Sequence, residues 1–543
     1  MTSLLFMLLL IPLAAGGLLL LFAGASQARS ARWIAAVGSI AVLAMSLALA
    51  GQYRQLPQSS GAVGVASPVQ PKVEFRKPWL TMAGEEGQRM TLEFHFGLDG
   101  VSVAMIVLTA LLTVACVLIS WEAIRERESE FYAALLILET GLIGVFCAFD
   151  AVLFYVFFEL TLIPLFFLIA IWGGPQRRYA AVKFFLYTLA GSLVTLLGLV
   201  TLVGSAAASG LASPCSLPEL AAWYRDNPLP QAWQIGVFLA LSAGFLIKVP
   251  VFPFHTWLPL AHVEAPTAGS VLLAGVLLKL GTYGFLRLCL PMLPMACLAV
   301  GLPMAAILGV VGIVYGSLCA LVQRDVKKLV AYSSVAHLGF CMLGLFALNS
   351  EGITGGVLQM INHGLSTGAL FLIVGMFYDR YHTRMVDDLG GLANRLPLMA
   401  AAMVFVSMAS VGLPGLNGFP GEMLSLAGMF RRNSFYAAAG ALGLVLGAWY
   451  LLTMLQSVFF GPLKEPALGG ESAAHHSVGD LSLRELGALA PIAIAILLIG
   501  VRPQPLVDMI RPDVEAVARL YEGRRAYTEI AVADRSLATE QQP

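Results

Sequence analysis

The sequence predicts an all-α polytopic membrane protein with about fourteen transmembrane helices. Two observations support this fold class. Hydrophobic residues make up 58% of the 543 residues and charged residues only 12%, and the mean hydropathy is +0.82, which is far too apolar for a soluble globular protein. The apolar residues are also grouped into runs of about 20, the length of a helix that crosses a bilayer.

The predicted spans follow these apolar runs along the chain. They lie near 3–23, 31–50, 98–121, 130–149, 151–172, 179–204, 234–259, 265–290, 295–322, 327–348, 354–378, 397–430, 434–460 and 486–502. The first run has no basic segment before it and is too long for the core of a signal peptide, so we interpret it as a retained transmembrane helix. An even number of spans places both termini on the same side of the membrane.

The basic residues indicate which side that is. The short loops after even-numbered spans hold only Arg225, Arg287, Arg431 and Arg432. The loops after odd-numbered spans hold Arg29, Arg32, Arg125, Arg127, Arg177, Arg178, Arg324, Lys327, Lys328, Arg380, Arg384, Arg395, Lys464 and Arg484. Because cytoplasmic loops are enriched in Lys and Arg, both termini are expected to be extracytoplasmic. The long loop 51–97 is then expected to form an extracytoplasmic cap, and the polar tail after Arg502 to be a short surface helix or disordered.

Composition and motifs exclude several classes of function. The formal net charge is zero and no segment is dense in Lys and Arg, so nucleic acid is not an expected partner. The seven cysteines contain no CxxC pair, which argues against an iron–sulfur cluster or a disulfide framework. A dinucleotide fingerprint, a P-loop and a hydrolytic Ser/His/Asp set are also missing from the sequence. We therefore expect neither a cofactor nor a soluble substrate bound directly by this chain.

Two predicted spans are broken by prolines. The seventh contains FPFH at 252–255 after Pro250, and the twelfth contains FPGE at 419–422 after Pro414. When the fourth to eighth spans are laid over the ninth to thirteenth, the two broken spans coincide. Five spans are an odd number, so the second block enters the membrane from the opposite side. Paired broken helices in inverted repeats indicate a binding or transport site near the bilayer midplane.

This repeat divides the chain into four regions. Residues 1–128 hold the first three helices and the extracytoplasmic loop, 129–293 the first five-helix repeat, 294–461 the second, inverted repeat, and 462–543 the last helix and polar tail.

Six titratable residues lie inside six different predicted spans, which is the pattern of a proton relay. They are Glu159, Lys248, Lys279, His337, His363 and Glu422. Each buried ion costs about 2.5 to 3.5 kcal/mol on insertion scales, so it calls for a function. The alternative for Glu159 and Lys248 is a structural ion pair, although buried pairs contribute little to stability.

The two histidines have alternatives of their own. Each could be a packing residue or a hydrogen-bond bridge. Haem ligation is disfavoured, because no helix holds two histidines about two turns apart facing one side.

A few further polar residues have no single interpretation from sequence. His255, His262 and Glu264 lie beside the first break, where they could hydrate the entrance of a path or cap the following helix. Glu139 lies within the fourth span and could extend the relay. Asp150, at the junction of the fourth and fifth spans, is expected to be a helix cap.

The motifs around these residues resemble a known family. They are FGLDGVS (96–102), FYVFFELTLIP (154–164), KVPVFPFHTWLPLAHVEAPT (248–267), AYSSVAHLGF (331–340), YHTRMVDDLGGL (381–392) and LPGLNGFPGE (413–422). In length and order they are similar to the antiporter-like membrane subunits of NADH:quinone oxidoreductase, respiratory complex I, and most to the subunit M or chain 4 type. Glu422 favours that type, because the related L and N types and the multisubunit sodium/proton antiporter typically carry lysine there.

The resemblance implies a proton-translocating subunit in a bacterial cytoplasmic (inner) membrane, acting with other membrane-arm subunits of the L and N types. It also implies roles for the buried residues: Glu159 and Lys248 as a switching pair, Lys279 as the central relay lysine and Glu422 as the end of the channel. The enzyme is then the assembled oxidoreductase, and the redox chemistry lies in other subunits. A sodium/proton antiporter module and a subunit of a proton-pumping membrane hydrogenase are the alternatives.

Overall fold

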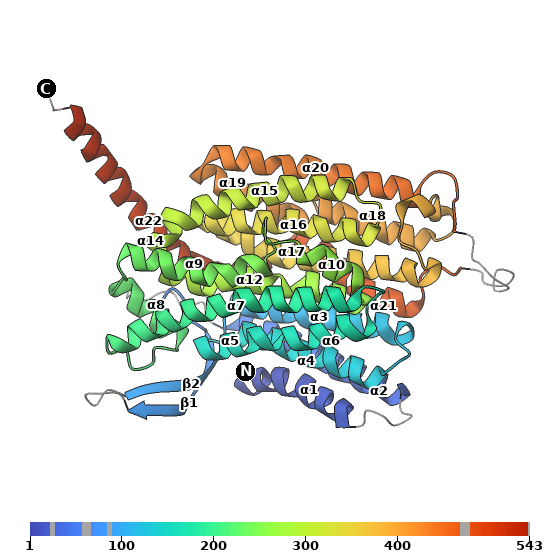
Figure 1. Cartoon of the computed structure of the whole chain (residues 1–543), viewed down its shortest axis with the longest axis horizontal. Helices are drawn as coiled ribbons and strands as arrows, with labels where there is room; N and C mark the ends of the chain where they lie inside the picture. The colour runs from blue at the N-terminus through green and yellow to red at the C-terminus, as the bar shows by residue number, and fades with distance from the viewer. Residues whose placement is uncertain (22–27, 57–66, 84–88, 467–477, 541–543) are drawn as a thin grey trace.

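The computed structural model describes residues 1–21, 28–56, 67–83, 89–466 and 478–540, and its helices lie side by side in one bundle (Figure 1). The N-terminal region contains α1 (Thr2–Leu21), α2 (Ala28–Gln55), β1 (Val73–Ala83), β2 (Arg89–Leu98) and α3 (Gly100–Ala123). Next come α4 (Glu128–Cys147), α5 (Ala151–Leu160), α6 (Leu162–Trp172), α7 (Arg177–Ala208), α8 (Leu217–Asp226), α9 (Gln231–Lys248) and α10 (Trp257–Glu264).

The next span alternates between α-helix and π-helix. It consists of α11 (Thr267–Leu272), η2 (Leu273–Leu277), α12 (Lys279–Gly284), η3 (Phe285–Cys289) and α13 (Leu290–Met292), where η2 and η3 are π-helical turns. After it come α14 (Pro294–Ala296), the π-turn η4 (Cys297–Gly301), α15 (Leu302–Leu321), α16 (Val326–Phe346), α17 (Ser350–Tyr381) and the 3₁₀ turns η5 (Val386–Asp388) and η6 (Leu392–Asn394). The chain ends with α18 (Pro397–Val411), α19 (Gly418–Arg432), α20 (Ser434–Phe459), α21 (Leu483–Val501) and α22 (Gln504–Glu540).

The polytopic helical fold is confirmed. Within the described ranges, 13 helices are long and apolar enough to cross a membrane, and α18 is a shorter apolar helix. The predicted seventh span is broken between α9 and α10, and the predicted twelfth between α18 and α19. Proline explains both breaks, because it lacks the N–H of a helical hydrogen bond and clashes with the preceding turn.

Two segments differ from the sequence-based expectation. Part of the loop 51–97 is an antiparallel hairpin, in which β1 pairs with β2 from Val73 opposite Leu98. Apolar residues alternate along β2 with the period of two that favours a strand. The expectation of a short surface helix or disorder after Arg502 was wrong: α22 is a helix of 37 residues, and in Figure 1 its distal end projects beyond the bundle.

The core of the bundle is formed by two spans. The most apolar window of Thr267–Met292 and that of Ser350–Tyr381 are both 100% buried, whereas the corresponding values are 33% for α1 and 28% for α21. A charged residue in the buried part of these spans, such as Lys279, therefore faces other helices rather than lipid or water.

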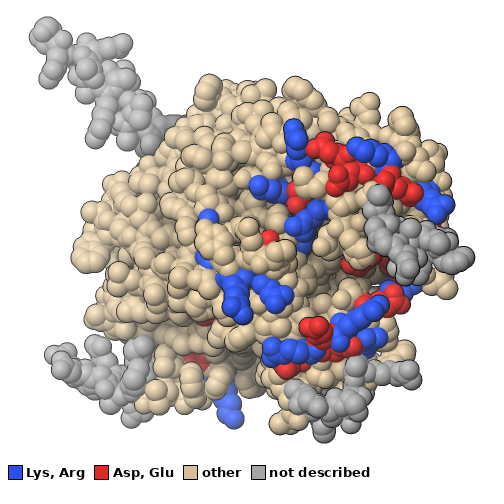
Figure 2. All heavy atoms as spheres, turned by 45° about the vertical axis from the view of Figure 1, so that its right-hand side comes forward, with Lys and Arg blue, Asp and Glu red and all other residues tan. Residues whose placement is uncertain are grey.

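Charged side chains gather at one end of the molecule. Figure 2 shows Lys, Arg, Asp and Glu concentrated on the end that lies on the right in Figure 1, whereas the rest of this face has few charges. The loops there include exposed Arg125, Arg127, Arg177, Arg178 and Arg324. The hairpin lies at the opposite end (Figure 1). A largely apolar face with basic loops gathered at one end is expected of a membrane protein.

Candidate functional site

The first broken helix places Lys248 at the last residue of α9. Pro250 and Pro253 follow within the next five residues, and regular helix resumes only at Trp257. The indole N–H of Trp257 donates to the carbonyl of Ile247 at 3.0 Å. A side chain beyond the break thus satisfies a carbonyl near the end of α9, as the membrane interior demands of broken helices.

Lys248 is 1% exposed, and its Nζ has no hydrogen-bond partner among the residues that the structure describes. The ammonium lies 4.7 Å from the centroid of the Phe158 ring. The next residue of α5 is Glu159, which is half-buried and whose Oε1 also has no partner in the described ranges. The two charges are within electrostatic range of each other. Their arrangement is that of neighbours rather than of a hydrogen-bonded ion pair.

Lys279 begins α12, between the π-turns η2 and η3. It is 0% exposed. Its Nζ donates to the carbonyl of Ala274 in η2 and contacts Nδ1 of His363 in α17 at 2.7 Å. A lysine ammonium has no acceptor lone pair, so Nδ1 must accept, which places the proton of a neutral His363 on Nε2.

His337 and Glu422 form a second contact group. Nδ1 of His337 in α16 lies 2.9 Å from Oε1 of Glu422 in α19. Its Nε2 lies 3.3 Å from the hydroxyl of Tyr450 in α20, and Nε2 of Gln359 in α17 donates to Glu422 Oε1 at 3.0 Å. Glu422 is 2% exposed and is itself one of the residues that line a groove of about 500 Å³.

The two contact groups meet at the pair of histidines. The ring centroids of His337 and His363 are 5.7 Å apart, and Nε2 of His363 has no hydrogen-bond partner in the described part of the chain. The structure thus brings Lys279, His363, His337 and Glu422 into one continuous group. Lys248 packs against Gly281, two residues after Lys279 in the same span. A Cβ added to Gly281 would lie 3.1 Å from the Cβ of Lys248.

The second break positions Glu422. Gly412 ends α18 with φ of 82° and Gly415 follows with φ of 93°, a region that side chains with a Cβ disfavour. Helix α19 resumes at Gly418, so Glu422 lies in its second turn. Asn417 anchors the break, because its Nδ2 donates to the carbonyl of Asn362 at 3.0 Å.

The other polar residues near the breaks lie outside this group. His255 is 3% exposed and stacks on Phe252 with ring centroids 5.8 Å apart. His262 is 0% exposed and stacks on Phe371 at 4.5 Å. Glu264 does not cap the following helix: its Oε2 accepts from the backbone N–H of Gln176 at 2.8 Å.

Two further acidic residues, Glu139 and Asp150, differ in their hydrogen bonding. Glu139 is buried in α4, and both of its carboxylate oxygens have no partner within the described ranges. Asp150 is the N-cap of α5, as predicted, and accepts from the N–H of Val152 at 2.8 Å. Burial raises the pKa of Asp150 to about 6.

Two basic residues that the sequence places in loops lie in the protein interior. Arg287 is 3% exposed in η3 and forms an ion pair with Asp99, the N-cap of α3. Lys327 is 8% exposed and donates to the carbonyl of Ala265 at 2.5 Å. These two residues are structural and do not report membrane sidedness.

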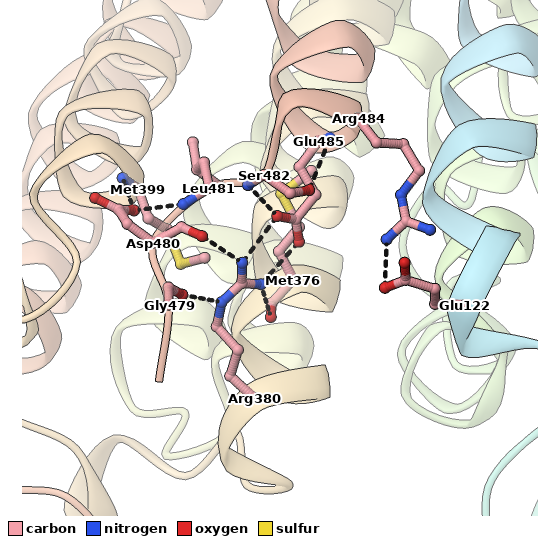
Figure 3. A network of polar contacts seen from close by, with 10 residues as sticks. All are labelled: Glu122, Met376, Arg380, Met399, Gly479, Asp480, Leu481, Ser482, Arg484 and Glu485. Carbon is pink, nitrogen blue, oxygen red and sulfur yellow. Dashed lines mark hydrogen bonds and ion pairs between the residues drawn. The ribbon is translucent and has the colours of Figure 1, made fainter. Parts of the chain in front are cut away.

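A polar network fixes α17 at the charged end of the molecule (Figure 3). Arg380, near the end of α17, donates to both carboxylate oxygens of Glu485 in α21 at 2.8 Å. It also donates to the carbonyl of Asp480 at 3.0 Å. The carboxylate of Asp480 accepts from the N–H of Leu398 at the start of α18 at 2.7 Å. The helix that carries His363 is thereby tied to α18 and α21.

Sequence reasoning missed Gln359 and Tyr450. Both are uncharged, and nothing in the sequence distinguishes them from the other uncharged polar residues of the spans. Gln359 precedes His363 by one helical turn, so helical spacing to a titratable residue was the only available signal.

Comparisons with known proteins agree with this fold and site, which together define an antiporter-like polytopic membrane protein. A family model described as NADH:quinone oxidoreductase/Mrp antiporter, TM, matches residues 148–448. NADH-quinone oxidoreductase subunit M of Rhodobacter capsulatus is 40% identical over 96% of this chain and 97% of its own length. NADH-ubiquinone oxidoreductase chain 4 of Arabidopsis thaliana is 42% identical over 78% of this chain and 82% of its own.

Solved structures show the same likeness. A chain of respiratory complex I from Thermus thermophilus with bound NADH has a TM-score of 0.80 and 32% identity, covering 95% of this chain and 99% of that one. A chain of the Mrp complex from Dietzia has a TM-score of 0.77 at 20% identity, covering 96% and 98%, and this likeness concerns the fold alone.

The chain therefore belongs to the subunit M (chain 4) family of NADH:quinone oxidoreductase. It is a proton-translocating subunit of the membrane arm and part of respiratory complex I. Subunit M is a membrane subunit without redox centres, and its bacterial homologues lie in the cytoplasmic membrane.

Proposed function

We propose that protons move through this chain along a line of buried side chains that crosses from α9 to α19. The members of the line, in order, are Lys248, Lys279, His363, His337 and Glu422, with Glu159 controlling the charge of Lys248. The contact of 2.7 Å between Lys279 Nζ and His363 Nδ1 carries this proposal. An ammonium that donates to a neutral imidazole nitrogen is one proton transfer away from a neutral amine beside an imidazolium.

Each step follows from the contacts. A carboxylate near a lysine favours its charged form, so withdrawal or protonation of Glu159 releases a proton from Lys248. Gly281 allows the span that carries Lys279 to approach Lys248, because it has no side chain in between. His363 then passes the proton towards His337 by a small ring movement across the gap of 5.7 Å between ring centroids. His337 Nδ1 already contacts Glu422.

The energy has to come from other subunits. Moving one charge against about 150 mV costs roughly 3.5 kcal/mol. A paired carboxylate changes the balance between the two forms of a lysine by about 1.4 to 4 kcal/mol. One Glu159–Lys248 switch is therefore only just sufficient. No cofactor is proposed for this chain, and the proposed partners of the chain are other membrane-arm subunits of the L and N types.

The proposed arrangement in the membrane puts both termini on the extracytoplasmic side. The cluster of exposed basic loops at the end opposite the hairpin (Figure 2) supports this orientation. We also propose that regions 129–293 and 294–461 are inverted repeats. The support is that each contains one broken helix bearing a relay residue, Lys248 in the first and Glu422 in the second.

Replacing Lys279 by Ala in the assembled complex tests the proposal. Quinone-linked turnover and proton pumping should fall together by about ten-fold or more, because the central donor is lost. Oxidation of NADH by a water-soluble acceptor should stay unchanged, since it does not use this chain. The matched control is Lys77→Ala, which removes an exposed lysine of β1. Normal pumping by assembled Lys279→Ala complexes would rule out the relay.

A further inference from the structure

Helices α17 and α19 pack closely against each other at Gly355 and Gly421, and Gln359 lies at this contact. A Cβ added to Gly355 would lie 2.2 Å from the backbone nitrogen of Ser425. A Cβ added to Gly421 would lie 2.6 Å from Oε1 of Gln359 and 3.0 Å from its backbone nitrogen. The two backbones are therefore as close as glycine allows. Gln359, which is 2% exposed, is held between them.

Within the described ranges, the side chain of Gln359 makes one hydrogen bond, to the end of the proposed relay. Its Nε2 donates to Oε1 of Glu422 at 3.0 Å, and its own Oε1 has no partner among the described residues. The amide nitrogen has to face the carboxylate, because a carboxylate oxygen and an amide oxygen are both acceptors. The packing against Gly421 leaves the side chain little room to move.

The same carboxylate oxygen also contacts the histidine that precedes it in the relay. Nδ1 of His337 lies 2.9 Å from Glu422 Oε1. The second oxygen, Oε2, lies on the Gly412 side, where a Cβ would be 2.9 Å away, and both residues line the groove of about 500 Å³. One oxygen of Glu422 therefore serves the histidine, while the other is next to the groove.

The amide differs from the other groups at this carboxylate in that it does not titrate. His337 and Glu422 change protonation state when a proton passes, and the hydroxyl of Tyr450 can reverse its hydrogen bond to His337 Nε2. The N–H of Gln359 donates whatever those states are. A donor that stays constant can hold Oε1 in place while the proton on the opposite side comes and goes.

We propose that Gln359 is a positioning residue for proton transfer at Glu422, whose amide N–H keeps Oε1 facing Nδ1 of His337. This inference rests on the proposed function, because it requires Glu422 to receive the proton. The amide can reach the carboxylate because Gly421 has no side chain to block it. Gln359 itself does not carry the proton.

The test uses two replacements of Gln359 in the assembled complex. Gln359→Met removes the donor at similar length, and Gln359→Asn keeps a buried amide that is one methylene too short to reach Oε1. Both variants should lose about ten- to a hundred-fold in quinone-linked proton pumping, the range that a hydrogen bond to a charged group is typically worth. Their infrared spectra should show the protonated Glu422 carboxyl band, identified by its absence from Glu422→Gln, shifted to higher wavenumber.

A second glutamine serves as the matched control. Gln234 is 0% exposed, and its side chain donates to the carbonyl of Leu229 and accepts from the N–H of Met295, far from Glu422 in sequence. Gln234→Met should lower stability without shifting the carboxyl band. Wild-type pumping and an unshifted band in Gln359→Asn would overturn the positioning role. Normal pumping by Glu422→Gln would instead overturn the proposed function and this inference with it.

Discussion

At the scale of single residues, the ammonium groups of the three buried lysines differ in their hydrogen-bond partners. Lys279 donates to a carbonyl and contacts His363. Lys327 donates to the carbonyl of Ala265 at 2.5 Å. Lys248 has no hydrogen-bond partner among the described residues and lies 4.7 Å from the centroid of the Phe158 ring. Burial of a lysine ion costs about 2.5 to 3.5 kcal/mol. The nearby carboxylate of Glu159 opposes this cost by favouring the charged form of Lys248.

Replacing Lys248 by Ala should therefore disable the first switch. Pumping and quinone-linked turnover should fall together by about ten-fold or more, while oxidation of NADH by a water-soluble acceptor is unaffected. Lys248→Arg should restore little, because a guanidinium hardly releases its proton at any accessible pH. Unchanged pumping in Lys248→Ala would leave only a structural role for the residue. The measurement is acidification of membrane vesicles against turnover.

The sequence made the charged members of the site visible and left the neutral ones hidden. Lys248, Lys279 and Glu422 stand out because ions in apolar runs are rare. Gln359 and Tyr450 do not, since amides and phenols are tolerated in such runs without a function. Their roles depend on which helices cross, and crossing partners are set by tertiary packing that a single sequence does not encode locally.

At the scale of elements, the span that carries Lys279 is the least regular. Its π-turns η2 and η3 lie on either side of α12. A π-turn shifts the register of backbone hydrogen bonds, and such turns are frequent at functional sites. Here the carbonyl of Ala274 in η2 accepts from the ammonium of Lys279. The turn therefore helps to determine where the lysine points.

Two glycines of this span offer a matched pair of substitutions. In Gly281→Ala the new Cβ would lie 2.6 Å from the carbonyl oxygen of Phe245 and 3.1 Å from the Cβ of Lys248. In Gly275→Ala it would lie 2.4 Å from Leu112 Cδ1, the end of a side chain that can turn aside, and 3.5 Å from the carbonyl oxygen of Gly364. Gly281→Ala should reduce pumping several-fold in assembled complexes, and Gly275→Ala should change it little. Equal effects would contradict a special contact between the two spans.

Elements were predictable where one local signal dominates. Proline located both breaks, and apolar length located the spans. The π-turns were not predicted, because no residue type marks them in the sequence. The length of α22 was underestimated because its residues are polar and its support comes from distant contacts, such as Tyr521 Oη donating to the carbonyl of Leu290 at 2.6 Å.

At the scale of the whole molecule, α22 packs against the start of α3, next to the hairpin. Asp513 of α22 accepts from the backbone N–H groups of Gly100 and Val101 at 2.8 Å and 3.2 Å. The start of α3 is thus capped from a residue more than 400 positions away, next to the ion pair of Arg287 with Asp99. Burial and the charge of Asp99 raise the pKa of Asp513 well above its usual range.

This arrangement makes docking of α22 dependent on pH. A carboxyl whose pKa is raised in the docked state binds a proton that the undocked state gives up. Docking is therefore strongest below the ordinary pKa of about 3.9, and it weakens as pH rises towards the raised pKa.

Asp513→Asn keeps an acceptor without a charge, so docking should become independent of pH. Asp513→Ala leaves two N–H groups unpaired and should loosen α22 by about 1 to 3 kcal/mol. Gly100→Ala should loosen it too, because its Cβ would lie 1.9 Å from the carbonyl oxygen of Met509. Hydrogen exchange of residues 504–522 measures all three, and identical exchange in Asp513→Asn and the parent protein across pH 5 to 9 would refute the linkage.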